Sequence, residues 1–165
     1  MSHNPHAKGT RLDKLTALAI LGFVLLCVVV VVGPVRALAK ARDELRAEHV
    51  RALMAAAMQL EAENPELFTS MVERVKSAGD MRVMIGDGNC AGSHGSECRD
   101  YVTSDSCLPI RSYLEHDLLP ELPVDPNKRL FTVSLPGYYL QFVDEGIEVG
   151  ACGAATREVK LEHEL

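Results

Sequence analysis

The chain is poor in aromatic residues and in catalytic motifs. Its 165 residues include no Trp, four Tyr and four Phe, and the formal net charge is −6. No cluster of Lys and Arg is interleaved with aromatic residues, which argues against nucleic acid as a partner. The motifs G-x-S-x-G, S-x-x-K and H-E-x-x-H are also missing, and no histidine forms an evident base–nucleophile pair. We therefore expect no enzymatic activity and no cofactor.

Charge is absent from the whole stretch between Leu15 and Val35. A bilayer is crossed by a helix of about 20 apolar residues, so residues 15–35 are expected to form one transmembrane helix after a polar lead, residues 1–14. Gly33 and Pro34 lie near its outer end, where proline would bend the helix or loosen it locally. Roughly 130 residues remain, enough for one small domain.

The helical pattern continues into an amphipathic segment, residues 36–63, which contains no Gly or Pro. We call this segment the stalk. Its apolar residues share one helical face, which we expect to pack against the distal domain: Leu38, Ala41, Leu45, Ala52, Leu53, Ala56 and Leu60. Its charges can pair along an opposite, solvated side: Lys40 with Glu44, Asp43 with Arg46, and Glu48 with Arg51. His49 lies on the apolar stripe and is expected to be an interface histidine rather than a ligand.

The distal part, residues 64–156, has the pattern of a small α+β cap domain. Asn64 and Pro65 read as an N-cap followed by proline at the first helical position. The expected elements are a helix to residue 78, a strand at 81–85, a loop at 86–106, a short helix at 110–119, and strands at 130–135, 138–143 and 147–151. The last three strands would form an antiparallel meander. A polar tail, residues 157–165, is expected to be disordered.

The five cysteines indicate in which cellular compartment the cap domain lies. Cys27 lies in the apolar run and reads as a small apolar residue. Four others fall in the cap domain, and their even number predicts disulfides and an oxidising compartment, with three pairings open: Cys90, Cys98, Cys107 and Cys152. Basic residues flank the apolar run on both sides, so the positive-inside rule does not decide its orientation. The cysteines favour a cytoplasmic N-terminus and an extracytoplasmic cap domain.

The sequence leaves three other interpretations open. A zinc site in a reducing compartment would use Cys90, His94, Cys98 and Cys107, although their spacing matches no common zinc module. Calcium could bind loop oxygens, although no EF-hand spacing is present and solvated side chains are the simpler reading: Asp87, Asn89, Glu97, Asp100, Asp125 and Asn127. Cleavage of a signal peptide after residues 37–39 is disfavoured, because the apolar run exceeds the usual ~7–15 residues.

The order of the parts resembles type IV pilins and the pseudopilins of type II secretion. A cytoplasmic lead is followed by a membrane helix, an amphipathic stalk and a small sheet that caps it. Local segments are similar too: Lys40-Ala41-Arg42-Asp43 in the stalk, Leu118-Leu119-Pro120-Glu121-Leu122-Pro123-Val124-Asp125-Pro126 before the terminal sheet, and Gly137-Tyr138-Tyr139-Leu140 and Val149-Gly150-Ala151-Cys152-Gly153-Ala154 in its last strands. The likeness covers roughly residues 8–155.

The N-terminus aligns with the family's processing site and departs from it at two positions. Pilin precursors are cut after a glycine, which Gly9 matches, so the new N-terminus would be Thr10. Thr10 stands where the family has phenylalanine, and Lys14 where it has a glutamate that registers an incoming subunit against its neighbour's amine. A lysine there would repel that amine.

The resemblance implies a filament subunit, major, minor or tip-type, whose apolar helices pack side by side. Its partners would be other pilin-like subunits, a membrane assembly platform, a prepilin peptidase and membrane lipid. The alternatives are a membrane-tethered extracytoplasmic interaction domain that never polymerises, and an enzyme or zinc module.

Overall fold

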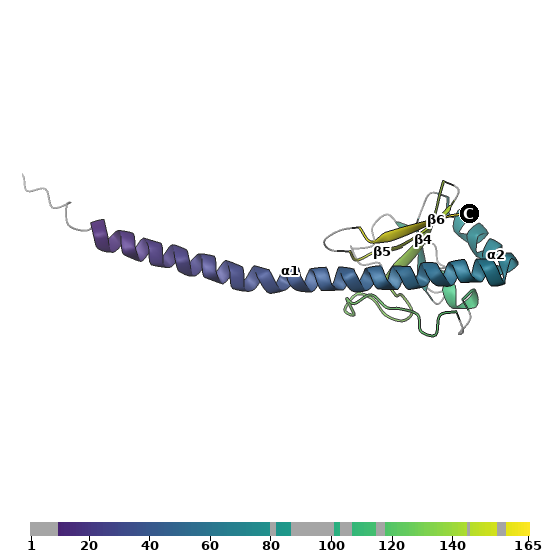
Figure 1. The fold of residues 1–165 in the computed structure, drawn as a ribbon, viewed down its shortest axis with the longest axis horizontal. Coiled ribbons are helices and arrows are strands. Elements are labelled where there is room, and N and C mark those ends of the chain that lie inside the picture. Colours follow the sequence, from purple (N-terminus) through teal and green to yellow (C-terminus); the bar gives the residue numbers. More distant parts are fainter. Residues whose placement is uncertain are drawn as a thin grey trace, which may run out of the picture. The chain divides into compact units, whose positions relative to one another are not determined.

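The computed structural model describes residues 10–79, 82–86, 101–102, 107–114, 118–144, 146–154 and 158–165. The chain divides into two compact units, Met1–Ala39 and Lys40–Leu165, which we call unit 1 and unit 2. Unit 1 contains the first part of one long helix. Unit 2 contains the second part of that helix, a shorter helix and a mixed sheet, so the fold is α+β as the sequence predicts (Figure 1).

Helix α1 spans Thr10–Glu63 and has Pro34 inside it. The helical pattern that continues from the apolar run into the stalk is therefore confirmed. The helix ends where Asn64 begins the next one. Asn64 Oδ1 accepts a hydrogen bond from the Leu67 backbone N–H at 3.1 Å, which caps helix α2, Pro65–Lys76. The predicted N-cap and first-turn proline are thus confirmed.

The sheet is mixed, not antiparallel as we expected. Its principal strand order is β2-β1-β4-β5-β6, and β3 pairs with β1 off this path. Strand β1 pairs in parallel with β2 and β3, while β4, β5 and β6 form antiparallel pairs. The strand bounds are Arg82–Gly86 for β1, Tyr101–Val102 for β2, Leu108–Pro109 for β3, Tyr138–Val143 for β4, Gly146–Ala151 for β5 and Lys160–Glu164 for β6.

Two expectations about the meander are wrong. Residues 130–135 form no strand, because Thr132 and Leu135 exchange backbone hydrogen bonds of 3.0 and 3.2 Å and so close a tight turn. The third strand of the meander is instead β6, in the tail that we expected to be disordered. Its residues pair with β5, for example Leu161 with Val149 and Glu162 with Glu148. Backbone pairing to a buried neighbour strand thus outweighs the polar composition of the tail.

The short helix expected over residues 110–119 is only a 3-10 turn, η1, at Ile110–Ser112. Its first residue follows Pro109, which belongs to β3, so the chain turns directly out of a strand. Ile110 is buried and anchors the turn in the core, whereas the next two residues are exposed. Residues 115–117 lie outside the described residues.

The main core lies between the stalk part of α1, helix α2 and the sheet. Leu53, Ala56 and Leu60 are buried there, as the sequence predicts. Four other members of the predicted face are exposed: Leu38, Ala41, Leu45 and Ala52. The buried face of the helix is rotated toward Asp43, Arg46, Val50, Met54 and Ala57. An apolar strip of the stalk is therefore left uncovered, and two charged residues are buried.

Gly137 gives a prediction on stability. Its φ is +85°, and a Cβ built there would lie 2.7 Å from the Phe131 ring. Gly79 also has a positive φ, +68°, but nothing lies within 4 Å of its built Cβ. Gly79→Ala should therefore lower the free energy of unfolding only through the strained left-handed backbone conformation, by about 1–2 kcal/mol. Gly137→Ala should cost about 1–3 kcal/mol more, because the ring must also move. Urea unfolding of the full chain in detergent micelles measures both; equal losses would contradict the crowding at Phe131.

Candidate functional site

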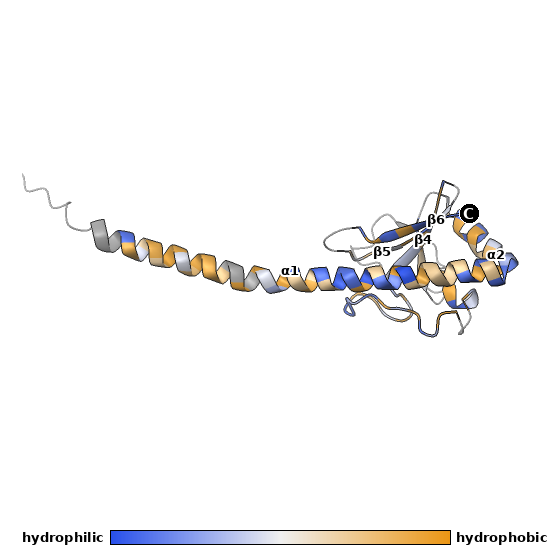
Figure 2. Cartoon of the chain, viewed as in Figure 1, coloured by the Kyte–Doolittle hydropathy of each residue, from blue (hydrophilic) through white to orange (hydrophobic). Residues whose placement is uncertain are grey.

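The surface of unit 1 is the first candidate site, because its apolar residues are exposed. Helix α1 has one segment long and apolar enough to cross a membrane, and none of that segment is buried by the rest of the protein. Figure 2 shows this stretch as predominantly orange, whereas blue and orange residues alternate through the stalk. Its large exposed side chains are Leu15, Leu18, Ile20, Leu21, Phe23, Val24, Leu25, Leu26, Val30 and Val35. This surface requires lipid or other apolar helices around it.

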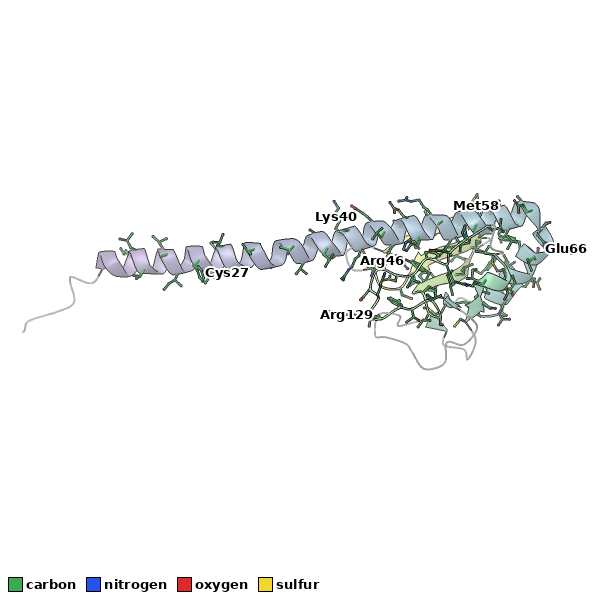
Figure 3. The ribbon with its side chains drawn as sticks, turned by 90° about the horizontal axis from the view of Figure 1, so that it is seen from below. Cys27, Lys40, Arg46, Met58, Glu66 and Arg129 are labelled. Atoms are coloured by element: carbon green, nitrogen blue, oxygen red, sulfur yellow. The ribbon has the colours of Figure 1, made fainter. Side chains whose placement is uncertain are left out.

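The residues singled out for processing and assembly lie on or just before this helix. Gly9 is outside the described residues, and Thr10 is the first residue of α1. Lys14 is exposed, and Pro34 lies within the helix rather than at its end. Cys27 is an exposed thiol on the same helix (Figure 3).

The second feature is a buried ion cluster at the start of unit 2. Arg46 is 2% exposed, Asp43 1% and Asp125 0%. The guanidinium donates from Nε and one terminal nitrogen to the two carboxylate oxygens of Asp125, at 2.6 and 2.9 Å, and from the other to Asp43 at 2.6 Å. Burial lowers the pKa of Arg46, but the hydrogen bonds to Asp125 and Asp43 outweigh it and raise the pKa overall.

This cluster corrects the expected solvated pairing of Asp43 with Arg46. The two residues do pair, but in the interior and together with Asp125, which the sequence places with Asn127 among solvated loop oxygens. Asp125 instead holds the chain before β4 against the stalk: its carboxylate also accepts the Asn127 backbone N–H at 2.7 Å, and its own N–H donates to Pro136 O at 2.9 Å. By contrast, the pair of Lys40 with Glu44 is exposed, as expected, at 3.9 Å.

A histidine–tyrosine contact lies one turn further along the stalk. His49 Nδ1 is 2.5 Å from the hydroxyl oxygen of Tyr138, and the rings meet edge to face. The pKa of His49 is lowered by burial, against the opposing charges of Asp125 and Glu48. Burial raises the pKa of Tyr138, so its hydroxyl stays protonated. His49 is thus an interface histidine that is held neutral, in agreement with the sequence.

The lowered pKa of His49 predicts a loss of stability in mild acid. In the unfolded chain the His49 imidazole becomes protonated near pH 6.5, whereas in the folded chain it becomes protonated only at a lower pH. The stabilisation is thus complete above pH 6.5 and is lost as the pH falls toward the lower, folded-state pKa, by at most about 1.4 kcal/mol per pH unit. His49→Gln should remove this component. Tyrosine fluorescence during urea unfolding at pH 7.5 and 5.5 tests it, and parallel pH curves for the two proteins would rule it out.

Sulfur groups gather on the other side of the sheet, in a smaller core with Met84, Phe131, Leu135 and Tyr139. Cys107 is buried there and is disulfide-bonded. Cys152 does not form the expected disulfide: it is a thiol whose Sγ lies 3.3 Å from Met84 Sδ. Cys90, His94 and Cys98 lie outside the described residues. Of the four possible zinc ligands, the structure therefore describes Cys107 alone. No group of metal-binding side chains occurs within the described ranges.

A fourth buried charged residue, Glu148 on β5, was not anticipated from the sequence. It accepts hydrogen bonds from Tyr139 at 2.8 Å and from Lys160 at 2.7 Å. The bonds to Glu148 and Glu162 raise the pKa of Lys160. Lys160 belongs to β6, so this contact ties the last strand to the sheet. The alternation of polar and apolar residues in β5 does not predict that Glu148 is buried, because its partner Lys160 lies in the distant tail.

Comparison of the chain with protein-family models, with curated proteins and with solved structures finds no match. The fold itself agrees with the layout expected from the resemblance: a long N-terminal helix is followed by a small mixed sheet.

Proposed function

We propose that the chain is a subunit, major or minor, of a filament related to type IV pili or type II secretion pseudopili, and that it assembles through helix α1. The observation that carries the proposal is the exposed apolar surface of unit 1, which no part of the described chain covers. In the membrane this surface contacts lipid chains. When a subunit is extracted from the membrane, neighbouring helices of the same kind would have to cover it.

The uncovered apolar strip of the stalk supports the same proposal. Leu38 is 53% exposed and Leu45 45%, and both belong to one face of α1 together with exposed Ala41 and Ala52. The small residues of this face would permit a close approach of another helix. The strip begins three residues after the uncharged run ends at Val35, so one continuous helix offers apolar contacts inside and outside the membrane.

The proposed location is the cell membrane, crossed once, with the N-terminus in the cytoplasm and unit 2 outside. The disulfide at Cys107 supports this orientation, because disulfides persist in oxidising compartments. The proposed partners are other pilin-like subunits, an assembly platform and a prepilin peptidase. The family's glutamate position holds Lys14, which favours one alternative, an extracytoplasmic interaction domain that remains tethered and does not polymerise.

The N-terminus of the mature chain distinguishes these two functions. N-terminal sequencing of the chain isolated from its own cells should begin at Thr10, through cleavage after Gly9. The control is the same strain without its prepilin peptidase, where the full-length chain should accumulate. An intact Met1 in cells that contain the peptidase would contradict the filament subunit and support the tethered domain.

A further inference from the structure

Unit 2 has a pocket of about 610 Å³ lined by three cationic side chains, Arg42, Lys128 and Arg129. Its other lining residues are Pro126, Asn127 and Leu130, so the lining carries no acidic side chain. None of the ion pairs formed within the described residues involves any of the three cations. This concentration of positive charge stands out in a chain whose net charge is −6.

The pocket is held in shape by the buried ion cluster. Arg42 lies one turn before Arg46 on α1, and Asp125, which binds Arg46, immediately precedes the segment that supplies Lys128 and Arg129. That segment is closed by backbone hydrogen bonds from Leu130 and Phe131 to the Asn127 carbonyl, at 3.0 and 3.2 Å. Figure 3 shows Arg129 at the same end of unit 2 as Arg46. The three cations are therefore presented by a fixed scaffold.

Only a short stretch of α1 separates Arg42 from the uncharged run that we expect to cross the membrane. Arg42 follows Val35, the last residue of the uncharged run, by seven residues. At ~1.5 Å per residue this is about 10 Å along the helix. The polar layer on each side of a bilayer is roughly 5–8 Å thick, and the Debye length at physiological salt is about 8 Å. A guanidinium at this distance lies just beyond the polar layer and within one Debye length of its phosphate groups, whereas a residue one or two turns further along would be largely screened.

We propose that this pocket binds the phosphate head group of an anionic phospholipid in the membrane that α1 spans. Arginine and lysine are the side chains that bind phosphate oxygens, arginine through paired hydrogen bonds. The anchor keeps such head groups beside the pocket at a high effective concentration, which no soluble acidic partner has. The inference rests on α1 crossing a membrane and is independent of filament assembly.

The test compares lipid selectivity in the full chain reconstituted into bilayers of phosphatidylcholine and phosphatidylglycerol. Electron spin resonance of spin-labelled lipids gives the relative association of the two head groups with the protein. The pocket variant is R42Q/K128Q/R129Q. The control variant, R51Q/R74Q/R111Q, removes the same charge from exposed arginines that do not line the pocket. Unfolding midpoints check that both variants fold.

We expect the native chain and the control to prefer phosphatidylglycerol. The pocket variant should lose at least about fivefold of that preference, since one cation near an anionic surface contributes roughly that factor. Residual preference from Arg36 and Lys40 should remain, and 0.5 M salt should weaken the native preference. A pocket variant within twofold of the native chain would overturn the proposal. An equal loss in the control would also overturn it, because the effect would then reflect net charge alone.

Discussion

Asp125→Ala should destabilise unit 2 by about 3–5 kcal/mol, the usual cost of removing one partner from a buried ion pair. The substitution deletes both acceptors of the fork from Arg46, which is 2% exposed and keeps only Asp43 as a counter-ion. It also removes the acceptor of the Asn127 backbone N–H. Total stabilities of small domains are about 5–15 kcal/mol, so the loss would be a large share of the whole.

Glu44→Ala is the matched control, because Glu44 is a carboxylate of the same helix whose pair with Lys40 is exposed. It should cost less than about 1 kcal/mol. Asp125→Asn keeps the shape and one acceptor, so its loss should be intermediate. Urea unfolding of the full chain in detergent micelles, followed by tyrosine fluorescence, gives all three values. If Asp125→Ala cost no more than Glu44→Ala, the ion cluster would have no structural role.

Leu25→Arg should leave the chain in the membrane but abolish its association with other copies. Arginine at the centre of a transmembrane helix costs about 2.5–3.5 kcal/mol on the insertion scale, whereas the fourteen Leu, Ile, Val and Phe residues between Leu15 and Val35 contribute about 4–8 kcal/mol in favour. Insertion therefore survives. Helix packing does not, because a subunit packed among apolar helices would have to bury the new charge without a partner.

Two measurements separate these effects. Alkaline extraction of membranes should retain Leu25→Arg as fully as the native chain. Sedimentation after solubilisation in mild detergent should show at least a tenfold loss of large assemblies for the variant. Met58→Arg introduces the same charge on the stalk, at a residue that is 45% exposed and does not belong to the uncovered apolar strip, and serves as a control for charge outside the membrane. Unchanged assembly of Leu25→Arg would mean that the apolar helix does not form the contact between subunits.

Local signals in the sequence predicted those parts of the fold that depend on neighbouring residues. Asn64 and Pro65 mark a helix start because capping involves residues within one turn, and the structure confirms it. The two strands that flank Asp144 were found because their apolar runs are separated by a turn. The uncharged run from Leu15 to Val35 likewise predicts a long apolar helix by itself, without knowledge of any distant contact.

Features that depend on distant residues were missed. Arg46 and Asp43 look like a surface pair three residues apart, and only Asp125, 79 residues beyond Arg46, explains their burial. The rotated face of the stalk follows from the same contact, since it turns Leu45 outward. The tail Lys160–Glu164 lacks apolar alternation, yet it becomes β6 because β5 offers it a complete row of backbone partners. Side-chain pattern alone carries no information on either contact.

The central claim, that α1 joins one copy to the next, is tested most directly by photo-cross-linking in the cells that make the protein. A benzophenone amino acid replaces Leu25, which is exposed on unit 1, and a parallel chain carries it at Met58 of unit 2, which is 45% exposed. Filament assembly through α1 predicts a ladder of dimers, trimers and longer products from position 25. Only monomer from position 25, in cells where the chain is abundant and membrane-bound, would contradict it.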